Sequence, residues 1–221
     1  MVDSLARYID HTLLRPTATL EDIQRLCGEA AAYHFAAVCV FPAQVPIARK
    51  ALSGSAVKIA AVIAFPFGVT FKETKAVELE ESAAAGATEA DLVTNLSLIK
   101  SGDDVSFEAE MRYLADAARR LSILSKFIIE TGSLNENEKV RICHIANRIG
   151  PNYLKTSTGF GATGATVADV QLMRANLRPE IHIKASGGIR SYSQALALLE
   201  AGASRIGTSS GVTIVEESRK L

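Results

Sequence analysis

Short apolar runs alternate with amphipathic segments along the whole chain. Most of the runs are apolar throughout, which is typical of parallel strands that are covered on both faces. The pattern therefore predicts a parallel sheet with eight strands, namely Tyr8–Thr12, Ala37–Phe41, Lys58–Phe65, Glu89–Asn95, Lys126–Thr131, Asn152–Thr156, His182–Ser186 and Ser204–Thr208.

The segments between these runs have the periodicity of helices. One of them places Ile142, Ile145, Ala146 and Ile149 at positions i, i+3, i+4 and i+7. Three helix starts are indicated by a capping residue with an acceptor or amide three positions later, at Asn135–Glu138, Thr166–Asp169 and Ser191–Gln194. Two segments end in Ala-Gly-Ala just before a strand, at Gly86 and Gly202, where glycine permits a left-handed helix cap.

Eight strand–helix units in 221 residues predict a (β/α)8 TIM barrel that forms a single domain over residues 1–221. An open, doubly wound α/β sheet is the alternative. A dinucleotide-binding version of that sheet has little support, because no G-x-G-x-x-G motif follows the first predicted strand.

Composition removes several functional classes. Basic and acidic residues balance at 24 each, so no charge excess points to nucleic acid. We expect no membrane segment and no signal peptide, because the apolar runs are short and the start lacks a basic region followed by an apolar stretch. The three cysteines are far apart and the four histidines lack metal-binding spacing. A cytoplasmic protein without metal or cofactor is the expectation.

Two lysines stand at the ends of predicted apolar strands, Lys155 and Lys184. Burying an ammonium group is costly, and a desolvated lysine beside a second cation can lose its proton and attack carbonyl groups. On consecutive parallel strands the two would be neighbours, roughly 5 Å apart, and each would make the other easier to deprotonate. The alternative is that each reaches solvent or pairs with a carboxylate such as Asp91 or Glu130.

Other polar residues also fall where predicted strands end, and in a barrel these ends form one rim that carries the active site. Asp91 lies inside an apolar run and therefore needs a cationic or hydrogen-bonding partner, which the lysine pair could supply. Its role would then be that of a counter-ion or of a proton relay. The remaining residues at these ends are Asp10, Thr12, Cys39, Asn95, Glu130, Thr131, Ser209 and Ser210.

The loops after the last two predicted strands are rich in glycine and serine. They read Ser186–Arg190, SGGIR, and Ile206–Gly211, IGTSSG. Barrel enzymes often bind phosphate at this place, where glycines let backbone N–H groups approach an anion and serines add donors. The alternative is a pair of ordinary turns.

At these residues the chain resembles the deoxyribose-phosphate aldolase family. The motifs occur in family order from residue 9 to residue 211, so the resemblance covers most of the chain. They are IDHTLL at 9–14, VCV at 38–40, PIAR at 46–49, FPFG at 65–68, GATEAD at 86–91, IIETG at 128–132, KTSTGF at 155–160, KASGGIR at 184–190 and RIGTSSG at 205–211.

The resemblance implies a metal-free aldolase that cleaves 2-deoxy-D-ribose 5-phosphate reversibly into acetaldehyde and D-glyceraldehyde 3-phosphate. Lys155 would form a Schiff base, Lys184 would perturb it, and Asp91 would take part in proton transfer. We expect the phosphate at Gly187, Gly188, Gly207, Ser209 and Ser210, and the rest of the substrate against Asp10, Thr12, Cys39, Thr158 and Gly159. A homodimer is the oligomeric state that the family suggests.

The chain departs from the family pattern at two places. Thr88 stands where the G-A-D-E-x-D motif has aspartate, which bears on the local helix cap rather than on the chemistry. Some members end in a tyrosine thought to assist proton transfer, and here no tyrosine follows Tyr192. Water or another residue would have to replace it.

Three other functions fit the same features. The chain could be a Schiff-base barrel aldolase for a different sugar phosphate, a barrel isomerase or synthase that forms no imine, or a phosphosugar-binding protein without turnover.

Overall fold

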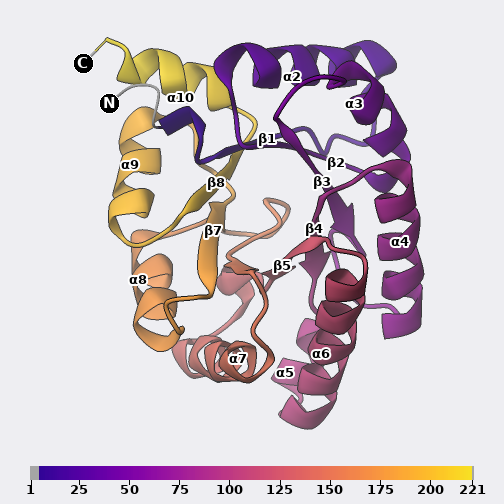
Figure 1. Cartoon of the computed structure of the whole chain (residues 1–221). Helices are drawn as coiled ribbons and strands as arrows, with labels where there is room; N and C mark the ends of the chain where they lie inside the picture. Colours follow the sequence, from indigo (N-terminus) through magenta and orange to yellow (C-terminus); the bar gives the residue numbers. More distant parts are fainter. Residues whose placement is uncertain (1–4, 221) are drawn as a thin grey trace.

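The computed structural model describes residues 5–220 and contains a closed barrel of parallel strands in sequence order. Figure 1 shows the strands as an inner ring with the helices around it. The strands are β1 (Ile9–Thr12), β2 (Ala37–Val40), β3 (Lys58–Ile63), β4 (Glu89–Val93), β5 (Leu124–Ile128), β6 (Tyr153–Lys155), β7 (His182–Ser186) and β8 (Arg205–Thr208). The predicted (β/α)8 TIM barrel is confirmed.

Pairing between the first and last strands closes the ring. Asp10 of β1 is in register with Gly207 of β8, so no strand edge is left open. The predicted strands all occur, but several end earlier than expected. Strand β3 stops before Ala64 and β5 stops before Glu130, which have φ angles of 53° and 46°. A left-handed residue cannot continue a strand, and such conformations are difficult to foresee for residues other than glycine.

Helices follow the strands and form the outer layer in Figure 1. They are α2 (Leu20–Tyr33), α3 (Val45–Ala51), α4 (Lys72–Ala85), α5 (Leu96–Lys100), α6 (Asp104–Arg120), α7 (Glu136–Ile149), α8 (Val167–Asn176), α9 (Tyr192–Glu200) and α10 (Gly211–Ser218), with short 3₁₀ turns η1 (Pro42–Gln44) and η2 (Thr131–Ser133).

The predicted helix signals have the expected geometry. Asn135 and Ser191 each form a reciprocal capping box with the residue three positions later, and the Thr166 side chain accepts a hydrogen bond from the Asp169 N–H. Gly86 and Gly202 are left-handed, with φ angles of 115° and 114°. The helix end at Gly86 is intact although Thr88 departs from the family motif. The Thr88 hydroxyl accepts a hydrogen bond from the Ile59 N–H of β3.

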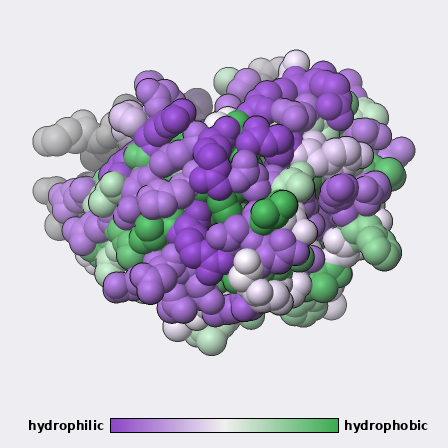
Figure 2. Space-filling view, turned by 90° about the horizontal axis from the view of Figure 1, so that it is seen from below, coloured by the Kyte–Doolittle hydropathy of each residue, from purple (hydrophilic) through white to green (hydrophobic). Residues whose placement is uncertain are grey.

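The apolar core has two unequal parts. The larger cluster fills the layer between strands and helices, and a small one of Leu14, Cys39, Ala60 and Val62 lies against the inner side of β2 and β3. Hydrophilic residues predominate on the face shown in Figure 2. Within the described residues, no helix is both long and apolar enough to cross a membrane.

Candidate active site

The two lysines singled out in the sequence lie side by side inside the barrel. Lys155 ends β6 and is in register with Lys184 of β7, and both side chains are buried. Their Nζ atoms lie 2.6 Å and 2.7 Å from the same oxygen, Oδ2 of Asp91 on β4. The predicted adjacency is confirmed. Pairing with Asp91, which we gave as the alternative to reactivity, occurs as well.

A third lysine shares this carboxylate. Lys126 Nζ lies 2.9 Å from Asp91 Oδ1 and 2.6 Å from Glu89 Oε2. Sequence reasoning missed Lys126 because it was placed at the start of its strand. The strand begins two residues earlier, at Leu124, so Lys126 sits in the middle of β5, in register with Asp91. A charged residue at the centre of an apolar strand is the signal that could have found it.

Asp10 and Arg205 extend the cluster below the lysines. Asp10 Oδ2 lies 2.5 Å from Lys184 Nζ, and its Oδ1 accepts a hydrogen bond of 2.7 Å from Arg205. Arg205 also lies 3.5 Å from Glu89 Oε2. Three carboxylates and four basic groups are therefore in mutual contact inside the barrel. With every group charged, the cluster would carry one excess positive charge.

The attractions in this cluster outweigh the cost of burial. Burial acts to raise the pKa of Asp91, but Lys126, Lys155 and Lys184 hold that pKa well below its usual value. The pKa of Asp10 is likewise lowered, against burial, mainly by Lys184 and Lys126. Both acids are therefore carboxylates at neutral pH.

The basic partners of these carboxylates shift in the opposite direction. Burial favours the neutral form of Lys184, but Asp10 and Asp91 overcome it and raise its pKa. Lys126 and Arg205 also have raised pKa values despite burial. The expectation that each lysine of the pair would lower the pKa of the other is therefore wrong for Lys184. It overlooked Asp10, whose carboxylate favours the charged form of Lys184.

A cavity of about 470 Å³ opens above this cluster. Of the four basic groups in the cluster, Lys155 alone lines it. Its other lining residues are Thr12, Leu13, Leu14, Arg15, Pro16, Thr158, Gly159, Phe160, Ser186, Gly187, Gly188, Ile189, Arg190, Gly207, Thr208 and Ser209. None of the lining residues within the described chain is acidic, so the cavity favours an anionic ligand.

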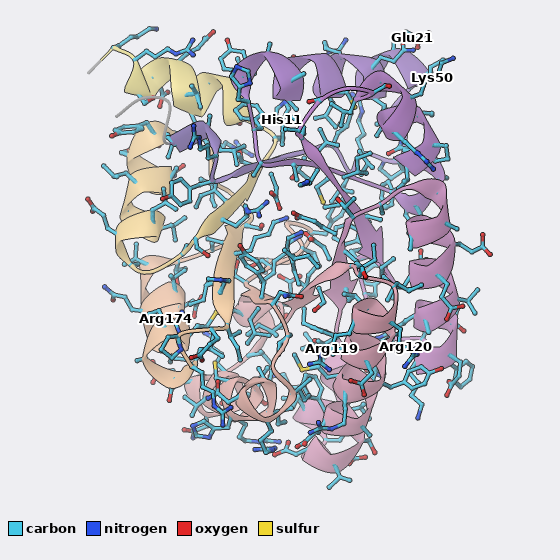
Figure 3. The ribbon with its side chains drawn as sticks, viewed as in Figure 1. His11, Glu21, Lys50, Arg119, Arg120 and Arg174 are labelled. Atoms are coloured by element: carbon cyan, nitrogen blue, oxygen red, sulfur yellow. The ribbon has the colours of Figure 1, made fainter. Side chains whose placement is uncertain are left out.

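Most residues predicted to contact substrate do line this cavity, while Asp10, Cys39 and Ser210 do not. Asp10 lies beneath it, fully buried among cations, because it points into the barrel one layer below Thr12. The next residue, His11, points the other way, toward Glu29 of α2, with 2.7 Å between His11 Nε2 and Glu29 Oε2 (Figure 3). The structure therefore places Asp10 as a partner of Lys184 rather than as a wall of the substrate groove.

Cys39 is also removed from the cavity wall. Its Sγ lies 3.8 Å from Asp91 Oδ2. Burial, reinforced by the Asp91 charge, raises the pKa of the Cys39 thiol to about 11. Since the thiolate is the reactive form of cysteine, Cys39 is a weak nucleophile in this position.

The glycine-rich loops form one side of the cavity. Gly187 and Gly188 have φ angles of 94° and 75°, which other residues rarely adopt. Gly207 is needed for a different reason, since a Cβ there would come within 2.9 Å of Lys184 Cε and 2.1 Å of Ser186 Oγ. Helix α10 starts directly after Ser210, whose N–H donates to Thr208 Oγ1 at 2.9 Å. A helix start beside glycine-rich loops that line the cavity suits a phosphate.

Two arginines that sequence reasoning did not assign also line the cavity. Arg15 follows β1, and its guanidinium donates to Asp22 Oδ2 at 2.6 Å. Arg190 follows the Gly187–Gly188 turn and is exposed. Glu130, which we considered as a partner for the lysines, instead accepts hydrogen bonds from the Thr158 N–H at 3.0 Å and its hydroxyl at 2.5 Å. Glu130 thereby fixes the loop that carries Thr158.

Comparisons with known proteins agree with this geometry. A family model described as DeoC/LacD family aldolase matches residues 4–217. Deoxyribose-phosphate aldolase from Thermococcus gammatolerans is 49% identical over 217 residues, which is 97% of this chain and 96% of that protein. The enzyme of the same name from a Geobacillus species is 48% identical over 216 residues, 98% of this chain and 96% of the other.

A solved structure shows the same similarity. The tetrameric deoxyribose phosphate aldolase from Aeropyrum pernix superimposes with a TM-score of 0.93 at 33% identity, covering 99% of this chain and 92% of the other. The matches span nearly the full length of this chain and of the similar proteins, and the family model covers every residue of the charged cluster. The chain therefore belongs to the DeoC/LacD family of aldolases.

Proposed function

We propose that this protein cleaves 2-deoxy-D-ribose 5-phosphate reversibly into acetaldehyde and D-glyceraldehyde 3-phosphate through a Schiff base on Lys155. The observation that carries the proposal is that Lys155 alone, among the buried bases around Asp91, lines the cavity. The names of the similar proteins point to the same substrate.

Charge balance supports a free amine on Lys155. Buried charges are tolerated when they are paired, and the cluster has three carboxylates for four bases. Lys155 contacts one carboxylate, Asp91, which Lys126 and Lys184 share. It is therefore the least compensated base, and removing its proton brings the cluster to neutrality.

The phosphate end of the substrate is assigned to the loops after β7 and β8. Gly187, Gly188, Gly207 and Ser209 line the cavity there, and Ser210 precedes α10. Thr12, Thr158 and Gly159 also line the cavity and are assigned to the rest of the sugar. Binding at the phosphate end fixes the open-chain sugar, so that its aldehyde meets the amine in a reactive orientation.

The reaction then follows from the amine. Lys155 Nζ attacks C1 of the open-chain sugar, and the carbinolamine loses water to give an iminium ion. A base removes the proton of the C3 hydroxyl, the C2–C3 bond breaks, and its electron pair moves into the iminium to form an enamine. D-glyceraldehyde 3-phosphate leaves. Protonation of the enamine at C2 and hydrolysis of the imine release acetaldehyde and restore Lys155.

The proton steps are assigned to Asp91 and a water molecule. Asp91 is held as a carboxylate, so it can accept and return a proton beside Lys155. Lys184 stays charged because of Asp10 and Asp91, so its part is that of a fixed cation which disfavours an ammonium on its neighbour. This arrangement needs no tyrosine after Tyr192.

Borohydride trapping tests the proposal. Incubation with 2-deoxy-D-ribose 5-phosphate and borohydride should give a stable covalent adduct, which peptide mapping should place on Lys155. An adduct on Lys126 or Lys184 would overturn the assignment, and the absence of any adduct would favour a barrel enzyme or binding protein without an imine. Release of dihydroxyacetone phosphate from a ketose phosphate, with no acetaldehyde released from 2-deoxy-D-ribose 5-phosphate, would indicate a different sugar phosphate as substrate.

The assembly is proposed as a homodimer of single-domain subunits spanning residues 1–221. Phe67, Val69 and Phe71, in the loop between β3 and α4, are 80%, 66% and 78% exposed, which suits burial against a second copy. In sedimentation, the wild type should behave as a dimer and Phe71→Glu as a monomer. A single domain should unfold in one cooperative transition.

The three free cysteines support the cytoplasm as the compartment, which fractionation of cells would test.

A further inference from the structure

Glu89, which is buried, and Arg205, which is mostly buried, do not line the cavity but are connected to Lys155 through Asp91. We propose that Glu89 and Arg205 are positioning residues which set, in opposite directions, the pH below which the enzyme loses activity, because each changes how strongly Asp91 holds Lys155. The inference rests on the proposed function, because it assumes that Lys155 reacts as a free amine.

Glu89 reaches Lys155 through Lys126. Glu89 opens β4 and lies beneath Asp91 on the same side of the strand, with its Oε2 2.6 Å from Lys126 Nζ. Lys126 in turn donates to Asp91 Oδ1 at 2.9 Å, and Asp91 Oδ2 accepts from Lys155 at 2.6 Å. Glu89 thus neutralises part of the charge of Lys126 and leaves more of the Asp91 charge for Lys155.

Arg205 reaches the same carboxylate from the other side. It donates to Asp10 at 2.7 Å, Asp10 lies 2.5 Å from Lys184 Nζ, and Lys184 lies 2.7 Å from Asp91 Oδ2. Arg205 neutralises part of the Asp10 charge, so Asp10 attracts Lys184 less strongly. Lys184 therefore interacts more strongly with Asp91. The two paths end on the two oxygens of one carboxylate.

Among residues 5–220, the titratable groups found in contact with the cluster come from the barrel strands. They are Asp10 of β1, Cys39 of β2, Glu89 and Asp91 of β4, Lys126 of β5, Tyr153 and Lys155 of β6, Lys184 of β7 and Arg205 of β8. Strand β3 contributes apolar side chains to this interior, Ala60 and Val62. Because Glu89 is buried and the Arg205 side chain is only 12% exposed, water screens the loss of either charge weakly and the effect reaches Lys155.

Neutralising Glu89 and neutralising Arg205 should therefore move the activity profile in opposite directions. In Glu89→Gln, Lys126 interacts more strongly with Asp91, so Asp91 holds Lys155 less strongly and activity should extend to lower pH. In Arg205→Gln, Asp10 interacts more strongly with Lys184, so Asp91 holds Lys155 more strongly and activity should be lost at higher pH. We expect the acid limb of kcat/KM to move by about half a pH unit to one unit downward in the first variant and upward in the second.

The experiment is a pH profile of kcat/KM for 2-deoxy-D-ribose 5-phosphate with the wild type, Glu89→Gln, Arg205→Gln and Arg205→Lys. The last variant keeps the charge and should restore the wild-type limb. Glu110→Gln removes a buried carboxylate between α4 and α6 and should leave the midpoint of the limb unchanged. Urea unfolding of each variant establishes that the folded enzyme is assayed.

Each outcome bears on one hypothesis. Shifts of opposite sign support the inference. The inference would be overturned if the midpoint of the acid limb did not move, or if it moved in the same direction in both variants. A purely structural role would lower activity or stability without moving the midpoint in opposite directions. If the wild type forms no borohydride adduct on Lys155, the proposed function itself fails. The two failures are thus distinguishable.

Discussion

Two lysine sites in this molecule have similar burial and different surroundings. Lys75 of α4 is fully buried, with its Nζ 2.7 Å from Glu110 of α6 and 2.9 Å from the Val93 carbonyl oxygen. Lys155 is 2% exposed and lies 2.6 Å from Asp91. Burial lowers the pKa of Lys75 in spite of its carboxylate. By burial and pairing alone, Lys75 would be as good a candidate nucleophile as Lys155.

Access and charge sharing separate the two sites. Lys75 lies in the layer between helices and strands and has Glu110 as its own partner, whereas Lys155 lines the cavity and shares Asp91 with two further lysines. A perturbed lysine becomes a nucleophile where a carbonyl can reach it and where neighbouring cations oppose its proton.

Replacing the two lysines should have the largest contrast. Lys155→Leu removes the nucleophile and should lower kcat/KM by roughly 10⁴-fold or more, with the fold retained. Lys75→Met should keep kcat/KM within about threefold of the wild type, because no step of the reaction uses it. Steady-state assay of acetaldehyde release measures both. A comparable loss in Lys75→Met would show that the comparison misplaces the chemistry.

Breaking the pair in the helix layer should affect stability instead. Glu110→Gln leaves the Lys75 ammonium without its carboxylate and should lower the free energy of unfolding by about 3 kcal/mol. The double variant Lys75→Met/Glu110→Gln should recover part of this loss, since no buried charge remains. Urea unfolding measures both values. An unchanged free energy in Glu110→Gln would mean that this pair contributes nothing measurable to the fold.

Much of the fold and of the site can be predicted from the sequence. Each apolar run predicted a strand, and the order of strands placed Lys155 beside Lys184. Lys126 and Arg205 were not assigned because strand register decides which side chains point into the barrel, and the predicted start of β5 was two residues late. The direction of the Lys184 pKa was wrong because Asp10 comes from a strand far away in sequence.

The cavity itself allows a smaller, selective test of access. Arg15 and Arg25 both donate to Asp22, but only Arg15 lines the cavity. Arg15→Gln should raise KM for 2-deoxy-D-ribose 5-phosphate about tenfold, the value of one charge-assisted hydrogen bond, and leave KM for unphosphorylated deoxyribose nearly unchanged. Arg25→Gln is the matched control and should change neither KM. Equal effects of Arg15→Gln on both substrates would argue against a phosphate contact.

Lys184, the neighbour of Lys155, and Lys75 should also respond oppositely to alkaline pH. The folded-state pKa of Lys184 is raised, so its contribution to stability is fully present below the unfolded value of about 10.4 and is lost as pH rises through the folded pKa. That of Lys75 is lowered, so the folded state releases its proton first, and stability rises with pH as the unfolded value is approached. For one proton, the slope of the free energy of unfolding against pH is at most about 1.4 kcal/mol per pH unit.

Urea unfolding from pH 8 upward measures each contribution. The free energy of the wild type minus that of Lys184→Met, or of Lys75→Met, gives one difference curve for each lysine. The Lys184 curve should decline above pH ~10.4 and the Lys75 curve should rise below it. Parallel curves would mean that Asp10 and Asp91 stabilise the Lys184 ammonium no more than Glu110 stabilises that of Lys75. The difference between a carboxylate shared by several lysines and one paired with a single lysine would then have no electrostatic effect.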